Sequence, residues 1–456
     1  MNGNKYVWLL IFVASYFLWG LYVNQYPIEI TSDDAFNFSR AVERFSVLEF
    51  RPHFPGYPAF VILNRVAATI VNPITANVWV SLLGALMLPL LVARIVFILS
   101  ASWWKSALGC VVLLMQPLLV SMALSGLSDP IALAFFLMAV ISAILQRNYH
   151  VGFWLGLMLA SRPSYFPLAM GLALFPLFVP SHLLKLKAYF QAASVIAIIG
   201  CVSLLFILQH DGMAYFEEGV RFTQGHFEIW GNTAEGNQSQ IIQWVKGLMS
   251  AYGLVILSSI FILLIWSLKT VFKKPSEQQL KARYVGMISV IALIYWVWIT
   301  LGQNPDNLRH WAPVLVLVII VFSMSFCSMF WQNKKGVVPL FVILLFIVTG
   351  DKLTVEQSRQ APIQQAIAWF EVHPEACMIG TNYSVNLLRD RLSERAVYDM
   401  YYPSSNIKLH EAALVSPESA WRISGTVLEK GILVQQFSAR FIGERTLYLY
   451  QIIDGQ

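Results

Sequence analysis

Long apolar segments recur along almost the whole chain, and they restrict the fold more than any other feature of the sequence. Their lengths approach the roughly 20 residues that a helix needs to cross a bilayer. Eleven such segments cover 6–23, 76–99, 106–124, 130–145, 151–161, 163–180, 188–208, 241–266, 284–301, 311–330 and 337–349. The chain is 57% hydrophobic and only 12% charged, which is not the balance of an ordinary soluble protein. We therefore predict a polytopic α-helical membrane protein with about 11 transmembrane helices.

Basic residues cluster on one side of these alternating segments and predict how the chain is oriented. Lysine and arginine are enriched in cytoplasmic loops, so this side is expected to face the cytoplasm. It holds Lys5, Lys105, Arg147, Lys185, Lys187, Lys269, Lys273, Lys274, Lys281, Arg283, Lys334 and Lys335. The N-terminus is then cytoplasmic, whereas the loop at 24–75 and the C-terminal region lie outside a bacterial inner membrane. Basic loops account for the net charge of +6, so we expect no nucleic-acid partner.

The outward loop at 24–75 opens with an acidic pair and an amphipathic pattern. Ser32 can cap a helix whose first turn contains Asp33 and Asp34, and the helix dipole favours ionised carboxylates there. Apolar residues then recur at helical spacing, which predicts a helix that lies flat on the membrane. They are Phe38, Ala41, Val42, Phe45 and Leu48. Prolines between 52 and 58 restrict the backbone and predict an ordered turn after this helix.

The composition changes near Asp351, where the apolar segments end. Mixed periodicities predict helices at 362–372 and 384–392 and strands at 376–380, 396–401 and 446–453. We expect a small soluble α/β domain at 351–456 that rests on the outer mouth of a membrane domain at 1–350. The domain contains no nucleotide-binding fingerprint or nucleophile elbow, which argues against a second catalytic centre.

Four motifs resemble those of the GT-C superfamily of membrane glycosyltransferases. The acidic pair is followed by HFPGYP at 53–58, which is similar to the HPPGYP-type run of bacterial protein O-mannosyltransferase-like proteins, except at Phe54. SDP at 128–130, ASRPSYFPL at 160–168 and NLRHWAP at 307–313 are of types seen at outward helix ends in these enzymes. The resemblance implies a GT-C membrane domain. It also implies transfer of a hexose or pentose, with inversion, from a polyprenyl-phosphate donor to an outward-facing glycan, lipid or protein.

The acidic pair is the candidate for the catalytic base. A carboxylate must deprotonate or orient the acceptor hydroxyl, and the carboxylate of the family's first outward loop matches Asp33 or Asp34. The sequence does not decide between the two residues. Helix capping accounts for both of them without any catalytic role.

Four basic residues are the candidates for binding the donor phosphate, namely Arg309, His310, Arg162 and Arg51. Arginine binds phosphate in a bidentate manner that lysine cannot match, and the amides at the start of a helix favour an anion near Arg309. An arginine near membrane depth, such as Arg162, needs a polar cavity or a partner. The alternative for each is a position among lipid headgroups.

The remaining candidates are assigned to substrate binding. His53 and Tyr57 lie in the HFPGYP turn, although His53 could equally have a structural role that locks the turn. Asp129 could be a second acid that faces the cavity or a helix cap. Glu228 and Trp230 belong to an acidic, aromatic loop that could bind an acceptor or sugar, or could form an ordinary interfacial belt.

Metal binding and two other classes of function stay open at this point. A divalent cation could bind Asp33, Asp34 and Asp129 through oxygen ligands, but no spacing demonstrates a site. A transporter or flippase of lipid-linked sugars would predict inverted repeats and midplane charges, neither of which is evident. A membrane receptor or scaffold, in which the C-terminal domain binds a partner, is the other alternative.

Overall fold

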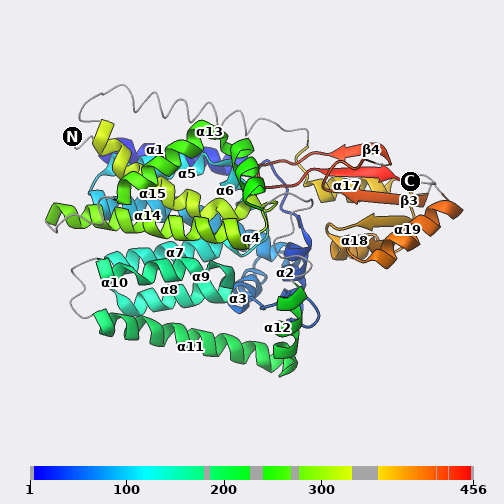
Figure 1. Ribbon diagram of the computed structural model, residues 1–456, viewed down its shortest axis with the longest axis horizontal. Helices are drawn as coiled ribbons and strands as arrows, with labels where there is room; N and C mark the ends of the chain where they lie inside the picture. Colours follow the sequence, from blue (N-terminus) through cyan, green and yellow to red (C-terminus); the bar gives the residue numbers. More distant parts are fainter. Residues whose placement is uncertain are drawn as a thin grey trace.

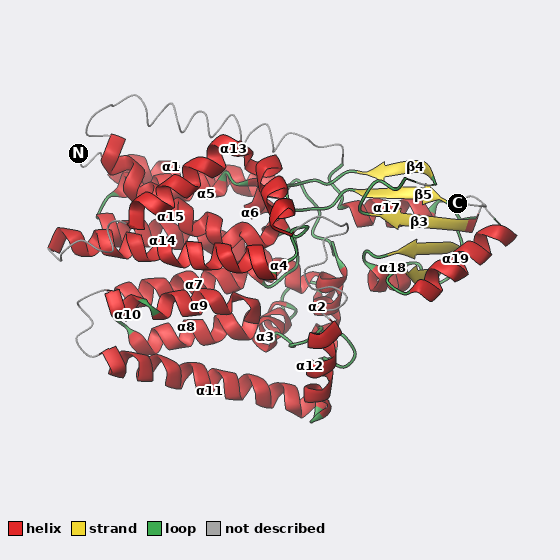
Figure 2. Ribbon diagram, in the orientation of Figure 1, coloured by secondary structure: helices red, strands yellow, loops and turns green. Residues whose placement is uncertain are grey.

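The computed structural model describes residues 5–178, 185–225, 240–268, 277–330, 358–416, 419–429 and 431–452. In these residues a long helical bundle is followed by a small domain that holds the named strands (Figures 1 and 2). The bundle comprises α1 (Lys5–Val23), α2 (Asp33–Glu43), α3 (Pro58–Ala67), η1 (Pro73–Thr75), α4 (Ala76–Ser100), α5 (Trp103–Leu114), α6 (Pro117–Ala123), α7 (Asp129–Ile144), α8 (Asn148–Ser161), η2 (Pro163–Tyr165), α9 (Phe166–Ala173), α10 (Phe175–Phe178), α11 (Lys185–Asp211), α12 (Ala214–Gly225), α13 (Gln240–Leu268), α14 (Glu277–Gly302), η4 (Leu308–Trp311) and α15 (Ala312–Phe330).

Ten of the eleven predicted apolar segments coincide with helices or short helix pairs, and the segment at 337–349 lies outside the described residues. Four of the described helices are long and apolar enough to cross a membrane, namely α1, α4 with η1, α11 and α14. The number becomes six if the bent pair α5–α6 and the two halves of α13 each form one span. Other predicted spans, such as α7, are shorter apolar helices. The predicted polytopic helical architecture is therefore present.

The segment at 151–180 is broken at Arg162, as its proline and arginine suggested. α8 ends at Ser161, and η2 and α9 continue the chain after Arg162, whose φ of −156° is extended. The residue after the break is Pro163, which lacks a backbone N–H for a continuous helix. The sequence thus places an arginine at an interruption between two apolar helices.

Polar contacts from α4 fix the position of α2 relative to the loop before α7. The buried Asn77 amide donates hydrogen bonds to the carbonyl oxygens of Ala35 at 2.9 Å and Gly126 at 2.8 Å. Farther along α4, Gly84 lets α7 approach closely, because a Cβ there would lie 2.4 Å from the backbone nitrogen of Ile131. The first turn of α7 is therefore held beside the start of α2.

The helix that carries the acidic pair is α2, and it begins as predicted. The Ser32 hydroxyl accepts a hydrogen bond of 3.2 Å from the backbone N–H of Ala35. The predicted position flat on a membrane is wrong, because six of the eleven residues of α2 are buried in protein. The helix packs on α3, α4 and the C-terminal domain. It also ends at Glu43, so Phe45 and Leu48 do not extend its apolar stripe.

The C-terminal domain is built on a five-stranded sheet with the order β2-β1-β3-β5-β4. Strand β1 pairs in parallel with β2 and β3, whereas β5 is antiparallel to β3 and β4. The helices and strands predicted from sequence correspond to α17, β1, α18, β2 and β5, whereas α19, β3 and β4 were missed. The elements are α17 (Pro362–Glu371), β1 (Met378–Thr381), α18 (Val385–Arg391), β2 (Ala396–Asp399), α19 (Pro403–Val415), β3 (Ala420–Ser424), β4 (Ile432–Phe437) and β5 (Leu447–Gln451).

The C-terminal domain lies at one end of the bundle, the end that also carries α2 and α12 (Figure 1). Helices α1 and α11 begin at the opposite end. The basic loops that we expect in the cytoplasm therefore include those farthest from the C-terminal domain. This arrangement agrees with a domain that rests on the mouth of the bundle. The proposed boundary at 350 and 351 falls outside the described residues.

Candidate functional site

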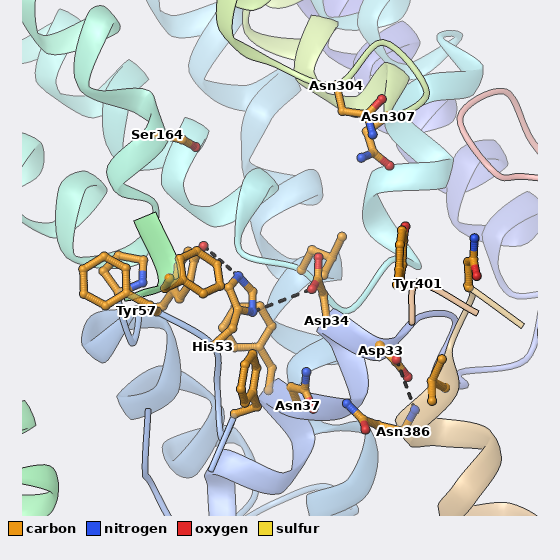
Figure 3. Close-up of a pocket in the computed structure, with 18 of the residues that line it drawn as sticks. Asp33, Asp34, Asn37, His53, Tyr57, Ser164, Asn304, Asn307, Asn386 and Tyr401 are labelled. Carbon is orange, nitrogen blue, oxygen red and sulfur yellow. Dashed lines mark hydrogen bonds and ion pairs between the residues drawn. The ribbon is translucent and has the colours of Figure 1, made fainter. Parts of the chain in front are cut away.

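A cavity of about 810 Å³ lies between the bundle and the C-terminal domain. Seven residues predicted from sequence line it, namely Asp33, Asp34, His53, Tyr57, Arg162, Arg309 and His310. They come from α2, the following turn, the break after α8 and the 3-10 turn η4, which are far apart in sequence. Figure 3 shows Asp34 between His53 and Tyr401, a residue of the C-terminal domain.

Asp34 carries the carboxylate that faces this cavity. Its Oδ1 lies 3.6 Å from His53 Nδ1, and its Oδ2 accepts a hydrogen bond of 3.3 Å from Arg309 Nη2. The side chain remains 41% exposed, so a ligand in the cavity can reach the carboxylate. Desolvation inside the cavity raises the pKa of Asp34, but interactions with His53, Arg309 and Arg162 outweigh it and lower the pKa below its usual value. The group is therefore ionised at neutral pH.

Asp33 has a different set of partners, although it is the neighbouring residue on α2. Its two carboxylate oxygens accept hydrogen bonds from the backbone N–H groups of Asn386, at 3.1 Å, and Leu387, at 3.0 Å. These amides lie in the first turn of α18, where no residue of the helix itself can pair with them. Burial raises the pKa of Asp33 to about 6, and the two amide hydrogen bonds lower it only in part. Asp33 thus tethers the C-terminal domain, which leaves Asp34 as the candidate base.

The HFPGYP turn presents His53 to Asp34. His53 Nε2 and the Tyr57 hydroxyl share a hydrogen bond of 3.0 Å. Gly56 has a φ of +100°, and a Cβ at this position would lie 3.0–3.1 Å from Val47 and Phe45, so only glycine fits without strain. Phe54, where the sequence departs from the family pattern, packs on Tyr215 and Phe222 of α12. His53 therefore both stabilises the turn and contacts the candidate base.

Arg162 lines the cavity and is held from behind by Asp129. The carboxylate Oδ2 of Asp129 lies 2.9 Å from Arg162 Nη1, and the two side chains are 1% and 9% exposed. Tyr165 donates a further hydrogen bond of 3.4 Å to Asp129 Oδ1. Neither sequence-based interpretation of Asp129 was right, because it does not line the cavity and Ser128 occupies the N-cap position of α7. Asp129 instead forms a buried ion pair with Arg162.

Arg309 and His310 lie on η4, where the chain enters α15. Within the part of the chain that the structure describes, Arg309 Nε, Arg162 Nε and His310 Nδ1 are buried without a hydrogen-bond partner. Buried donors normally have partners, so the two guanidinium nitrogens mark a place for an acceptor-rich ligand, whereas the His310 nitrogen donates or accepts according to its tautomer. Arg51 does not line the cavity, and its Nε, which is also buried without a hydrogen-bond partner among the described residues, lies 3.5 Å from Glu49 Oε2.

Two further predicted contacts receive no support from the structure. Glu228 and Trp230 lie outside the described residues.

The carboxylates of Asp33, Asp34 and Asp129 are bound to separate partners, namely α18, Arg309 and Arg162. Across the described ranges, no group of three or more histidine, cysteine or acidic residues is placed to hold a metal ion. The three aspartates therefore do not form the cation site that we considered.

The C-terminal domain supplies a wall of the cavity that no sequence motif indicated. This wall includes Asn382, Asn386, Asp399 and Tyr401, which lie at or after the carboxyl ends of β1 and β2. Parallel α/β sheets bind ligands outside the carboxyl ends of their strands, and the predicted strands at 376–380 and 396–401 both end beside these residues. That rule could have found them, whereas a search for catalytic motifs could not.

A buried ion cluster holds the same domain on the bundle. The Arg440 side chain is fully buried and contacts Glu29 Oε1 at 3.0 Å and Glu444 Oε1 at 2.6 Å. Glu29, in the loop after α1, also accepts a hydrogen bond of 2.5 Å from the backbone N–H of Ala361. Burial raises the pKa of Glu29 to about 7, although the Ala361 amide and Arg440 lower it. Docking therefore buries two acidic groups of the bundle, Glu29 and Asp33.

These two pKa values predict that docking is stronger at mildly acidic pH. The pKa of Glu29 is raised above its ordinary value of 4.5, and the pKa of Asp33 above its ordinary value of 3.8. When the C-terminal domain is docked on the bundle, these two groups therefore keep protons that they would release if the domain separated from it. The stabilisation is then complete below about pH 4 and is lost as the pH rises through 6 to 7. Hydrogen exchange of the α18 amides, corrected for intrinsic rates, should reveal greater protection at pH 5 than at pH 8.

Substitution separates this effect from general acid sensitivity. Asp33→Asn and Glu29→Gln should each reduce the pH dependence, because the amides keep the shape of the side chains but do not titrate. Asp390→Asn, on the exposed side of α18, should leave it unchanged. If the double variant Asp33→Asn/Glu29→Gln shows the same pH dependence of α18 protection as the wild type, these two residues are not its cause.

Known proteins resemble this chain in structure and not in sequence. No protein-family model and no curated protein matches it. The apo crystal structure of ArnT from Cupriavidus metallidurans has a TM-score of 0.55 at 12% identity and covers 97% of both chains. ArnT bound to undecaprenyl phosphate gives 0.56 at 12% identity, over 97% of this chain and 98% of that one. This chain has the GT-C fold.

The GT-C fold confirms the resemblance suggested by the four motifs and the expectation of an integral membrane protein. An oligosaccharyltransferase from Archaeoglobus fulgidus is also similar, with a TM-score of 0.49 at 11% identity over 92% of this chain and 70% of that one. At such identities the likeness extends to the fold alone. The role of each residue in the cavity must therefore be argued from its own contacts.

Proposed function

We propose that this protein is a membrane glycosyltransferase that moves a sugar from a polyprenyl-phosphate donor to an acceptor on the outer side. The acceptor is a glycan, lipid or protein of the cell envelope, and the reaction inverts the configuration of the sugar. Asp34 is the base, whereas Arg309, His310 and Arg162 face the donor phosphate. Because Asp33 caps α18 and Arg51 pairs with Glu49 outside the cavity lining, neither is assigned to the chemistry.

One observation carries this proposal, namely an ionised carboxylate beside unsatisfied cationic groups in a single cavity. The buried nitrogens of Arg309 and Arg162 lack partners among the described residues, while Asp34 is exposed to the same space. Phosphate oxygens are acceptors that match guanidinium donors in charge and geometry. A hydroxyl group of an acceptor is the matching partner for the carboxylate.

In this proposal Asp34 is a base that accepts its proton late in the reaction. Because Asp34 has a lowered pKa, it first orients the acceptor hydroxyl by accepting its hydrogen bond. As the acceptor oxygen bonds to the sugar carbon, the hydroxyl becomes acidic and its proton moves to Asp34. The bond between the sugar carbon and the phosphate oxygen breaks at the same time, and its electron pair stays on the phosphate.

Arg309 interacts with both the base, Asp34, and the donor phosphate in this proposal. Its Nη2 lies 3.3 Å from Asp34 Oδ2, and its Nε has no hydrogen-bond partner among the described residues. When a phosphate draws the guanidinium away, Asp34 loses part of its compensating charge, and its affinity for a proton rises. Donor binding would then make Asp34 a stronger base. The growing charge on the departing phosphate is stabilised by the same cation.

The test of this function is the loss of one sugar from the cell envelope. In a strain that lacks the protein, we expect mass spectrometry to reveal an envelope glycan, lipid or protein that is one sugar residue lighter. Restoring the wild-type chain should restore the residue, and the mass difference would identify both the sugar and its acceptor. Unchanged envelope glycans, together with movement of lipid-linked sugars across reconstituted vesicles, would instead support a flippase.

A further inference from the structure

The C-terminal domain faces the cavity with the carboxyl ends of its parallel strands. Strands β1 and β2 are paired in parallel with Thr381 opposite Asp399, so both strands end at the same edge. The connection after β1 leads to β2 on one side, and the connection after β2 returns to β3 on the other side of β1. Ligands of open α/β sheets bind where neighbouring connections diverge in this way. Here that edge carries Asn382, Asp399 and Tyr401, which all line the cavity.

The two walls of the cavity differ in their chemistry. The bundle wall presents cations and the rings of Phe38, Phe50, Phe54 and Phe222. The opposite wall presents amides, a carboxylate, a tyrosine ring and the guanidinium of Arg389, whose Nε and Nη2 both donate hydrogen bonds to the carbonyl oxygen of Val397. Because that guanidinium is already engaged, the other groups of this wall suit a ligand rich in hydroxyl groups. On this wall, Asn382 Oδ1 is buried without a hydrogen-bond partner in the described part of the chain.

The position of this wall is fixed by the contacts that dock the domain. The Asp33 carboxylate binds the first amides of α18, which directly follows the loop that contains Asn382. Asp34, the next residue of α2, faces the cavity from the same helical turn. Figure 3 places Asn386 and Tyr401 on the side of Asp34 that lies away from His53. A group bound by this wall of the C-terminal domain is therefore adjacent to the candidate base, Asp34.

We propose that the strand-edge residues Asn382, Asp399 and Tyr401 form a subsite for a glycosyl unit. The Asn382 carbonyl accepts a hydrogen bond from a sugar hydroxyl, Asp399 accepts another, and the Tyr401 ring covers an apolar face of the sugar. This inference rests on the proposed function and adds to it that the soluble domain, not the bundle, selects the sugar. A volume of about 810 Å³ leaves room for a sugar beside a phosphate.

The experiment compares ligands with and without a sugar, using the purified full-length protein in lipid nanodiscs. The probes are undecaprenyl phosphate, a panel of undecaprenyl phosphates that carry mannose, glucose, galactose or arabinose, and oligosaccharides released from the envelope. The variants are Tyr401→Ala, Asn382→Ala and Arg309→Gln. The control is His410→Ala, an exposed residue of α19 that does not line the cavity.

We expect Tyr401→Ala and Asn382→Ala to weaken binding of one sugar-bearing probe about tenfold and to leave undecaprenyl phosphate binding unchanged. If binding of a glycosylated undecaprenyl phosphate is weakened, the subsite holds the donor sugar. If binding of an oligosaccharide is weakened, the subsite holds the acceptor. Arg309→Gln should weaken every phosphate-bearing probe. The control should match the wild type with all probes.

Two outcomes would overturn the subsite, and a third concerns the function on which it rests. The subsite is wrong if Tyr401→Ala and Asn382→Ala leave the binding of every sugar-bearing probe unchanged. It is also wrong if both variants weaken binding of undecaprenyl phosphate as much as binding of the sugar-bearing probes. If the wild type and Arg309→Gln bind undecaprenyl phosphate equally weakly, the phosphate site itself is wrong. Thermal melting of each variant near that of the wild type would exclude misfolding as the cause.

Discussion

Asp34→Asn should reduce sugar transfer by about a hundred- to ten-thousand-fold, which is the usual contribution of a positioned general base. The amide keeps the size of the side chain and can still accept one hydrogen bond, but it cannot take a proton at neutral pH. The measurement is the rate at which the purified protein transfers sugar to the acceptor that the envelope analysis identifies. Binding of undecaprenyl phosphate should persist or become tighter, because a negative charge beside Arg309 is removed.

The neighbouring residue provides a matched control for this prediction. Asp33→Asn is the same chemical change one position earlier, and its amide oxygen can still accept a hydrogen bond from the first turn of α18, so it should lose far less transfer activity than Asp34→Asn. A loss of transfer in Asp33→Asn as large as in Asp34→Asn would reject the distinction between base and tether. Full activity in Asp34→Asn would reject the base itself.

Much of the bundle could be predicted because its signals are local. Runs of apolar residues predict helices, and Ser32 before two aspartates predicts the start of α2, because a cap depends only on residues within one turn. The sequence also places Arg162 at an interruption between apolar helices, where a charge requires a partner. That partner, Asp129, could not be identified from spacing, because it lies on another helix.

The separate roles of Asp33 and Asp34 depend on contacts between distant parts of the chain. Adjacent positions on a helix point in directions about 100° apart, so one carboxylate reaches α18 while the other reaches Arg309. No local pattern encodes that difference. The same reason explains the error over α2, because an amphipathic stripe packs equally well on a membrane or on protein.

The missed elements of the C-terminal domain have weak sequence patterns. Five of the six residues of β4 are exposed, so the strand lacks the alternation that reveals a half-buried strand. Only two residues of α19, Leu409 and Ala413, are buried, which leaves the helix without a clear apolar stripe. Because these elements were missed, the strand order was unknown, and the cavity wall at the ends of β1 and β2 could not be inferred.

Arg162→Leu is expected to have the largest effect on stability. It removes the partner of Asp129, whose side chain is 1% exposed, and leaves a buried carboxylate without its compensating charge. Breaking a buried ion pair from one side costs about 3–5 kcal/mol. Denaturant titration of the purified protein, followed by tryptophan fluorescence, should reveal a loss of this size. A loss below about 1 kcal/mol would mean that the pair is hydrated and resembles a surface ion pair.

The double variant Asp129→Leu/Arg162→Leu separates stability from ligand binding. With both charges removed, no buried ion lacks a partner, and apolar residues of similar size often replace such pairs without cost. Stability should therefore return close to that of the wild type. Binding of undecaprenyl phosphate should not return, because the guanidinium that faces the cavity is absent. Recovery of both properties would show that Arg162 serves only to compensate Asp129, and the phosphate would then depend on Arg309 and His310 alone.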